Sequence, residues 1–162
     1  MAYQKQEYNK YRVKTPVKSF RDLEVYRQTI LLSSEIFKFA PAIKKPAKGG
    51  SASGRKDKCL LNEFEILYSL SKFIPKLIAE SYGDRFSSNE MAFNKLEQAM
   101  RIIANIVTKI DFITATIENN EIKEDLNKIL AKYQKQRVKI NNLRRAWIRV
   151  YQERGGFERK NK

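Results

Sequence analysis

The residues best suited to chemistry in this chain are arginines and lysines near its C-terminal end. Arg137, Lys139, Arg144, Arg145 and Arg149 follow one another within a few helical turns. Guanidinium and ammonium groups donate charge-assisted hydrogen bonds, and phosphate oxygens are acceptors that such groups bind well. The pattern therefore predicts that these side chains hold the phosphates of RNA, with little direct reading of base sequence.

A second basic group lies at the N-terminal end of the chain. Arg12, Lys14 and Arg21 belong to it, and tyrosines alternate with cations in the N-terminal arm, residues 1–18. Aromatic rings can stack on bases while cations contact phosphates, so this group is a second candidate for RNA binding. The alternative is that the arm is a disordered, solubilising leader. For any single cation on the last helix, the alternative is a side chain that merely covers the edge of the core.

The chain lacks most of the residue types that catalytic sites use. The chain has no histidine and one cysteine, Cys59, so no Cys-His pair, Ser-His-Asp triad or Cys/His zinc site can form within one chain. We expect Cys59 to be a small buried hydrophobic residue on a helix. The acids of the predicted helices are expected to be solvated, namely Glu63, Glu65, Glu80, Glu97 and Asp111. We therefore expect a protein that is not an enzyme and has no metal or cofactor.

The charge balance indicates what kind of partner to expect. The 162 residues include 33 Lys and Arg against 18 Asp and Glu, and the net charge of +15 attracts nucleic acid or an anionic membrane surface. Residues 1–21, 38–58 and 121–162 carry +5, +6 and +8, and the rest sums to −4, which predicts a basic surface on a slightly acidic scaffold. With no apolar run long enough for a membrane span and no targeting signal, we expect a cytoplasmic protein without a membrane partner.

Helical periodicity predicts the elements that position these residues. Apolar residues recur at steps of three and four, and nowhere do they alternate as a strand requires. Ser19 is expected to cap the first helix and Pro41 to end it, and a capping box from Ser87 to Glu90 to open the third. The expected helices span about 19–39, 58–82, 88–119 and 121–153, with a mobile loop at 40–57 and a basic tail at 155–162.

The apolar residues of the last two helices form heptad seams. The third helix is expected to bury Phe93, Leu96, Met100, Ile103, Val107, Ile110, Ile113 and Ile117. The fourth is expected to bury Ile122, Leu126, Ile129, Tyr133, Gln136, Ile140, Leu143, Trp147 and Val150, with Gln136 the one polar member. Short connections after Tyr82 and Asn119 favour antiparallel neighbours. The fold class is therefore predicted to be all-α, an antiparallel up-down-up-down four-helix bundle.

Apolar residues outside the seam of the last helix suggest a contact with another subunit or protein. Val138 and Ile148 point away from the seam, and Leu130 and Tyr151 lie at its margin. A lone bundle would expose them, so an oligomer or partner interface is predicted. The alternative is that they are isolated apolar residues of the kind that most protein surfaces carry.

Four short motifs resemble known helical bundles. Residues 20–27 resemble the opening helix of the rRNA intervening-sequence proteins, and residues 72–83, with an internal Ile-Pro at Pro75, resemble their second helix. Ser81 stands where those proteins usually have glycine. Residues 58–61 and the Trp-Ile-Arg-Val sequence at 147–150 are similar to Avd, the accessory variability protein of diversity-generating retroelements. The resemblance covers roughly residues 18–155.

The resemblance to Avd implies a nonenzymatic accessory subunit. Avd-like proteins form a barrel-shaped homopentamer that binds a reverse transcriptase and its template RNA and supports mutagenic cDNA synthesis. Template RNA, a reverse transcriptase and copies of this chain in a ring or barrel, as a pentamer, are thus the expected partners. The alternative is a structural, self-assembling bundle of the rRNA intervening-sequence type without a specific nucleic-acid role. A weaker alternative is a peripheral membrane protein, although the basic face has few aromatic residues.

Overall fold

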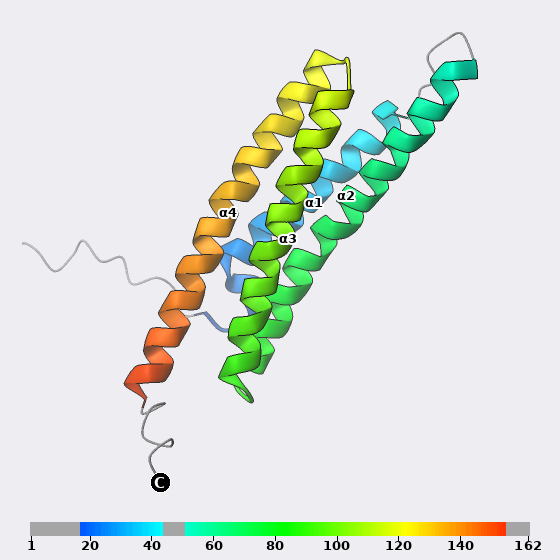
Figure 1. Ribbon diagram of the computed structural model, residues 1–162. Coiled ribbons are helices and arrows are strands. Elements are labelled where there is room, and N and C mark those ends of the chain that lie inside the picture. The colour runs from blue at the N-terminus through cyan, green and yellow to red at the C-terminus, as the bar shows by residue number, and fades with distance from the viewer. Residues whose placement is uncertain (1–16, 44–50, 155–162) are drawn as a thin grey trace, which may run out of the picture.

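The chain forms a four-helix bundle in a computed structural model that describes residues 17–43 and 51–154 (Figure 1). Within these ranges the only other regular element is a single 3-10 turn at Phe20–Asp22, and there is no strand. The prediction of an all-α fold is thus confirmed for the described part of the chain. The helices are α1 (Glu24–Ile43), α2 (Ser51–Asp84), α3 (Asn89–Thr116) and α4 (Asn120–Glu153).

Each helix lies beside two others, and ion pairs along the seams show that neighbours run antiparallel. Lys139 of α4 pairs with Glu24 at the start of α1, whereas Lys132 pairs with Glu35, further along α1, at 2.9 Å. The helices α2 and α3 are also antiparallel, because Asp84 at the end of α2 pairs with Lys95 in the early part of α3 at 2.7 Å. Among the described residues, the backbones of the diagonal pairs, α1 with α3 and α2 with α4, do not approach each other. Side chains such as Tyr82 of α2 and Trp147 of α4 meet between them, with ring centroids 6.4 Å apart, so the four helices enclose a single core.

Ion pairs also correct the expectation that the helical acids are merely solvated. Glu63 of α2 pairs with Lys109 of α3 at 2.5 Å, and Glu80 pairs with Lys95 at 3.3 Å. The periodicity of one helix does not reveal these pairs, because each joins two helices. Glu65 and Asp111 are exposed, as expected.

The core consists mainly of isoleucine and leucine along the full length of the bundle. Burying each such side chain contributes about 1.5–3 kcal/mol, so this interior dominates the stability of the fold. None of the described helices is long and apolar enough to cross a membrane. The largest fully buried side chains are Tyr133, Ile36, Leu67, Ile74, Ile78, Leu96, Ile103, Ile106, Ile110, Ile113, Leu126 and Ile140.

A polar layer interrupts this apolar core. Ser33 of α1 donates hydrogen bonds to the carbonyl oxygens of Thr29 and of Ser71 on α2, both at 3.0 Å. Tyr133 and Gln136 of α4 are buried too, but the Tyr133 hydroxyl and the Gln136 Oε1 have no hydrogen-bond partner among the described residues. Gln136, the polar member of the predicted seam, is therefore a buried and partly unsatisfied group.

The first helix begins later and ends later than predicted. The capping box of Ser19 and Asp22 exists, but it caps the 3-10 turn, and α1 starts only at Glu24 after an extended Leu23. At the other end the helix continues through Pro41 to Ile43. Proline has a φ that suits a helix, and the loss of one backbone hydrogen bond near a helix end does not terminate it here.

The second helix extends well into the predicted loop. It begins at Ser51 rather than near 58, so only residues 44–50 of the predicted loop 40–57 lie outside the described part of the chain. Adding turns to a helix that is already packed is easy, and one internal glycine, Gly54, costs only about 1 kcal/mol. Cys59 is exposed, contrary to expectation. Leu60 and Phe64 take the inward positions of these turns.

The third helix is shorter and is rotated relative to the predicted seam. Ser88, not Ser87, is the N-cap and accepts a hydrogen bond from the Met91 amide at 3.4 Å. The helix ends at Thr116, three residues before the predicted end. Because α3 packs against α2 as well as α4, its buried face includes positions that the heptad missed. The buried residues are Ala92, Leu96, Ala99, Ile103, Ile106, Ile110 and Ile113, whereas Phe93, Met100 and Val107 are only partly buried.

The fourth helix follows its predicted bounds within one residue. Asn119 caps it, accepting a hydrogen bond from the Ile122 amide at 3.1 Å. The predicted seam is buried from Leu126 to Trp147 except at Leu143, which is partly buried like Ile122. Val150 departs from the prediction, since its side chain is 43% exposed. Around Val150, near the C-terminal end of α4, most of the helix surface faces away from the core.

Candidate nucleic-acid interface

The outer side of α4 is the most strongly basic surface that the structure describes. From Leu126 to Gln152 this helix contains eight lysines and arginines and no acid. Its acids lie at the two ends, where Glu121 in the first turn suits the positive end of the helix dipole. Lys128 pairs with Asp125 of α4 itself at 3.1 Å. The positive charge of the later residues can be neutralised only by acids on other helices.

Three cations of this stretch are paired with neighbouring helices. Lys132 and Lys139 pair with Glu35 and Glu24 of α1. Arg144 approaches Glu97 of α3 at 3.6 Å and is only partly exposed. Thus Lys139 and Arg144, two of the residues predicted to hold phosphates, already have partners within the chain.

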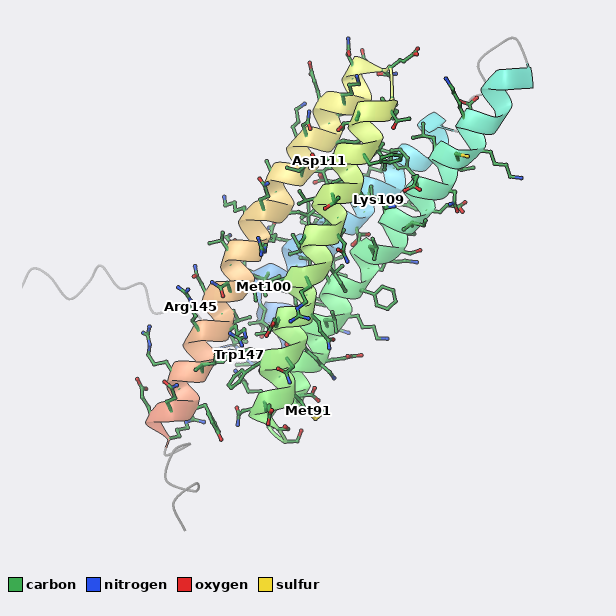
Figure 2. The ribbon with its side chains drawn as sticks, in the orientation of Figure 1. Met91, Met100, Lys109, Asp111, Arg145 and Trp147 are labelled. Atoms are coloured by element: carbon green, nitrogen blue, oxygen red, sulfur yellow. The ribbon has the colours of Figure 1, made fainter. Side chains whose placement is uncertain are left out.

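Four other cations have no ion pair and no side-chain hydrogen bond to any described residue. These residues, here called the outer cation row, are Lys135, Arg137, Arg145 and Arg149, and all are exposed. At about 100° per residue, Lys135, Arg145 and Arg149 fall within the half of the helix that lies opposite Tyr133 and Ile140, whereas Arg137, one turn after Tyr133, lies nearer the edge that faces α3. Figure 2 shows Arg145 on the outer side of α4 and Trp147 toward α3. With a rise of 1.5 Å per residue the row is about 21 Å long.

The outer cation row has the features that phosphate binding requires. Three of its members are arginines, whose planar donors can hold two phosphate oxygens at once. Neutral residues that can also donate to phosphate or ribose, Gln134 and Asn142, are exposed on the same side of α4. The like charges are not neutralised within the described chain, so their field attracts an acidic partner.

The predicted N-terminal group is not brought together with this row. Arg21 is exposed on the 3-10 turn, which contacts α1 and α2 but not α4, and its guanidinium lies 5.9 Å from the Phe20 ring centroid. Arg12 and Lys14 lie outside the described residues. Of the predicted phosphate ligands, Arg137, Arg145 and Arg149 are therefore the exposed and unpaired ones on α4, and Lys135 joins them.

The residues predicted to form an interface differ in exposure. Val138 is 60% exposed and lies among the members of the outer cation row. Tyr151 is also exposed, and the edge of its ring contacts Phe93 of α3, with centroids 6.1 Å apart. Leu130 and Ile148 are partly buried, and Leu130 packs against the core. Val138 is therefore the clearest outward-facing apolar residue of the set.

Arg85 and Phe86 are two further residues of interest, which the sequence did not predict. They occupy the turn between α2 and α3, where Arg85 contacts the ring of Trp147 on α4 and Phe86 contacts the ring of Tyr82 in the last turn of α2. Turn residues do not follow helical periodicity, so no pattern pointed to them. Among the described residues, no group of three His, Cys, Asp or Glu side chains is arranged to hold a metal ion.

Fold and surface together define a basic, all-helical bundle with one cationic outer face. Comparison with known proteins adds no family, since no protein-family model, curated protein or solved structure matches the chain.

Proposed function

We propose that this protein is a nonenzymatic accessory subunit that binds RNA through the outer face of α4 and serves a reverse transcriptase. The observation that carries the RNA-binding part is the outer cation row, which has no acid beside it on α4 and no ion-pair partner on the other helices within the described chain. Cations that only stabilised the bundle would face its seams, as Lys132, Lys139 and Arg144 do.

Binding in this proposal is electrostatic and largely independent of sequence. The row holds successive phosphates of one RNA strand and releases counterions, while Gln134 and Asn142 add hydrogen bonds to the sugar-phosphate backbone. The protein orients its RNA for a second protein rather than acting on it chemically. Binding of this kind needs no nucleophile, general base or metal.

The reverse transcriptase, its template RNA and the diversity-generating retroelement enter the proposal through the four motifs that resemble Avd and the rRNA intervening-sequence proteins. The same resemblance supports a cytoplasmic ring-shaped homo-oligomer, a pentamer in Avd-like proteins. The exposed apolar side chain of Val138 supports a contact with another chain. A ring would place several outer cation rows on one particle and so raise its avidity for a long RNA.

Charge reversal with a matched control tests the RNA-binding proposal. In the first variant Arg137, Arg145 and Arg149 become glutamate, and in the control the exposed α2 residues Lys58, Lys72 and Lys76 become glutamate. Both variants change the net charge equally. We expect the α4 variant to lose RNA in a mobility-shift titration while the control retains most of its affinity. Equal losses would mean that net charge alone attracts RNA, and the proposed site would be wrong.

The structural alternative also has an observation in its favour. Phe37, Phe73 and Phe112, on three different helices, are 58%, 48% and 56% exposed, which is typical of surfaces that dock on protein. Native mass spectrometry before and after nuclease treatment separates the two functions. An RNA-binding subunit is expected to carry RNA that nuclease removes, whereas an RNA-free oligomer that nuclease leaves unchanged would favour the structural bundle.

A further inference from the structure

A concave site lies where the turn between α2 and α3 meets the last turns of α4. Its cavity volume is about 320 Å³, and its lining consists of Arg85, Phe86, Asn89, Trp147, Val150, Tyr151 and Arg154. That volume is at the lower end of the range of small-ligand pockets, about 300–1,000 Å³. Three of the lining residues are aromatic, two are arginines and none is acidic.

The Arg85 guanidinium is at the centre of the aromatic groups. Its carbon lies 4.5 Å from the ring centroid of Tyr82, 4.9 Å from that of Phe86 and 5.1 Å from that of Trp147. Tyr82 in turn packs edge-on against Phe86, with centroids 5.7 Å apart. Such cation–π contacts hold the guanidinium in place although Phe86 is 75% exposed. The guanidinium plane of Arg85 and the ring of Phe86 thus present flat surfaces to solvent at a fixed position.

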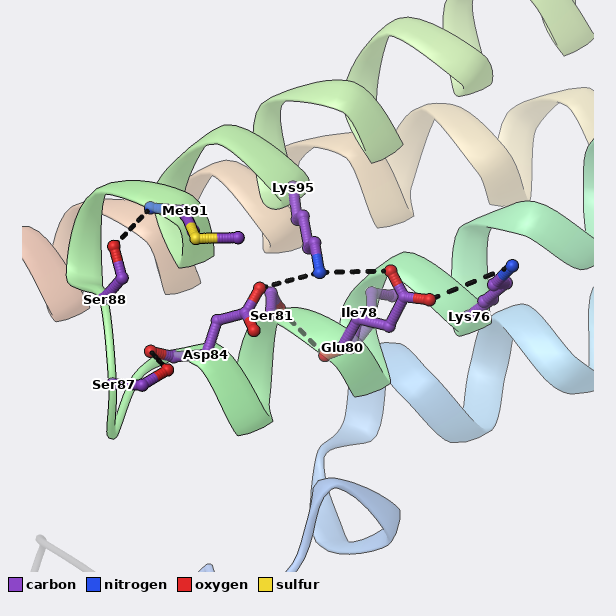
Figure 3. A network of polar contacts seen from close by, with 9 residues as sticks. All are labelled: Lys76, Ile78, Glu80, Ser81, Asp84, Ser87, Ser88, Met91 and Lys95. Carbon is purple, nitrogen blue, oxygen red and sulfur yellow. Dashed lines mark hydrogen bonds and ion pairs between the residues drawn. The ribbon is translucent and has the colours of Figure 1, made fainter.

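Polar contacts fix the turn that carries Arg85 and Phe86 (Figure 3). The Asp84 carboxylate pairs with Lys95, which also reaches Glu80, and the Asp84 carbonyl accepts hydrogen bonds from the amides of Ser87 and Ser88 at 2.9 and 2.6 Å. The contact with Asp84 is the main cause of a raised pKa at Lys95, which keeps the lysine charged. The walls of the site are therefore held in place without a ligand.

The chemistry of the lining selects a flat, electron-rich ring carried on an anionic backbone. Nucleobases stack on aromatic rings and on guanidinium planes, and an asparagine amide such as that of Asn89 can both donate to and accept from the edge of a base. Two arginines favour a ligand with phosphates and disfavour a cation. Arg149, the last member of the outer cation row, adjoins Val150 in sequence but lies about 100° from it around α4, so an RNA strand on the row has to pass around the last turns of α4 to reach the site.

We propose that this site binds one unpaired nucleobase of the RNA strand whose phosphates lie on the outer cation row, an inference that rests on the proposed RNA-binding function. A base in a duplex is stacked between its neighbours and cannot enter. The site therefore gives the protein a preference for single-stranded RNA, a discrimination that the outer cation row alone does not provide. Purines, with the larger stacking surface, are the better occupants.

The single tryptophan of the chain, Trp147, allows a direct test. Short oligoadenylate and a blunt RNA duplex of the same length are titrated while tryptophan emission and, separately, binding are followed. We expect oligoadenylate to change Trp147 emission and the duplex to bind without that change. Phe86→Ala is expected to weaken oligoadenylate binding about tenfold, within the range measured for loss of one base–aromatic stack, and to leave duplex binding unaltered.

Two further variants test whether the effect on RNA binding comes from stacking in the site, from charge alone, or from the loss of any exposed aromatic ring. Arg85→Lys keeps the charge but loses the planar group, and we expect a weakening similar to that of Phe86→Ala. Phe112→Ala removes an exposed ring of α3 that does not line the site, and we expect no effect. Both phenylalanines are mostly exposed, so these truncations leave the core intact.

The outcomes distinguish failure of this inference from failure of the proposed function. If oligoadenylate binds but Trp147 emission stays constant, or if Phe86→Ala binds oligoadenylate as well as the parent protein does, the base site is refuted while RNA binding stands. If neither RNA binds, the proposed function falls and the base site falls with it.

Discussion

The guanidinium of Arg144 on α4 lies 3.6 Å from the Glu97 carboxylate of α3, and its Nε donates a hydrogen bond to the Phe93 carbonyl oxygen at 3.3 Å. Arg145, the next residue, is exposed and has no such partner in the described chain. Adjacent arginines of one cluster thus have different surroundings, one at the seam between α3 and α4 and the other facing solvent.

This difference predicts opposite effects of two neighbouring substitutions. Arg144→Ala should lower the free energy of unfolding by less than about 1 kcal/mol, since the pair is partly exposed, and should change RNA affinity little. Arg145→Ala should leave stability within about 0.5 kcal/mol and weaken RNA binding. Urea unfolding and RNA titration of both variants measure this. The reverse pattern would place the RNA on the seam rather than on the outer face.

A second prediction concerns Gln136 in the core. Its side chain is 5% exposed and its Oε1 finds no hydrogen-bond partner among the described residues. Gln136→Leu should therefore raise the free energy of unfolding by about 1–3 kcal/mol, the usual cost of an unsatisfied buried group. Gln134→Leu, on the exposed side of the same helix, is the control and should bring no such gain. A destabilised Gln136→Leu protein would mean that the amide has a partner.

A third prediction concerns alkaline pH. Burial raises the pKa of Tyr133 above its ordinary value, and the nearby hydroxyls of Ser33 and Ser71 oppose this more weakly. The folded state therefore keeps the phenol proton where the unfolded chain loses it. Stability should be unaffected by this group below about pH 10 and should fall by about 1.4 kcal/mol per pH unit above it.

Comparison with Tyr133→Phe isolates this contribution from those of other tyrosines and lysines. Urea unfolding at about pH 9 and about pH 11 should show a smaller loss of stability in the variant than in the parent protein. Equal losses would mean that the Tyr133 hydroxyl reaches water in the folded state.

Heptad periodicity was sufficient to predict the class of fold and most of the core of α4. Leu126, Ile129, Tyr133 and Ile140 are buried as the pattern predicts, because one stripe of α4 faces the bundle. The pattern failed on α3, where Ala92, Ala99 and Ile106 are buried. A helix with two neighbours buries a wider face than one heptad seam describes.

The candidate site was predictable only in part. The cations of α4 could be found from composition, but not which of them face solvent, since Glu24, Glu35 and Glu97 lie far away in sequence. The base site could not be predicted from the sequence either, because its residues are also far apart along the chain. It combines a turn near residue 85 with a helix end near residue 150, and only the bundle brings these together.

The dependence of RNA affinity on salt tests the central claim most directly. If Lys135, Arg137, Arg145 and Arg149 each neutralise one phosphate of a single strand, the logarithm of the affinity should fall with the logarithm of salt concentration with a slope of roughly −3. Changing the three arginines to glutamine should reduce the slope to roughly −1. A flat response in the parent protein, or the same steep slope in the variant, would contradict RNA binding by the outer face of α4.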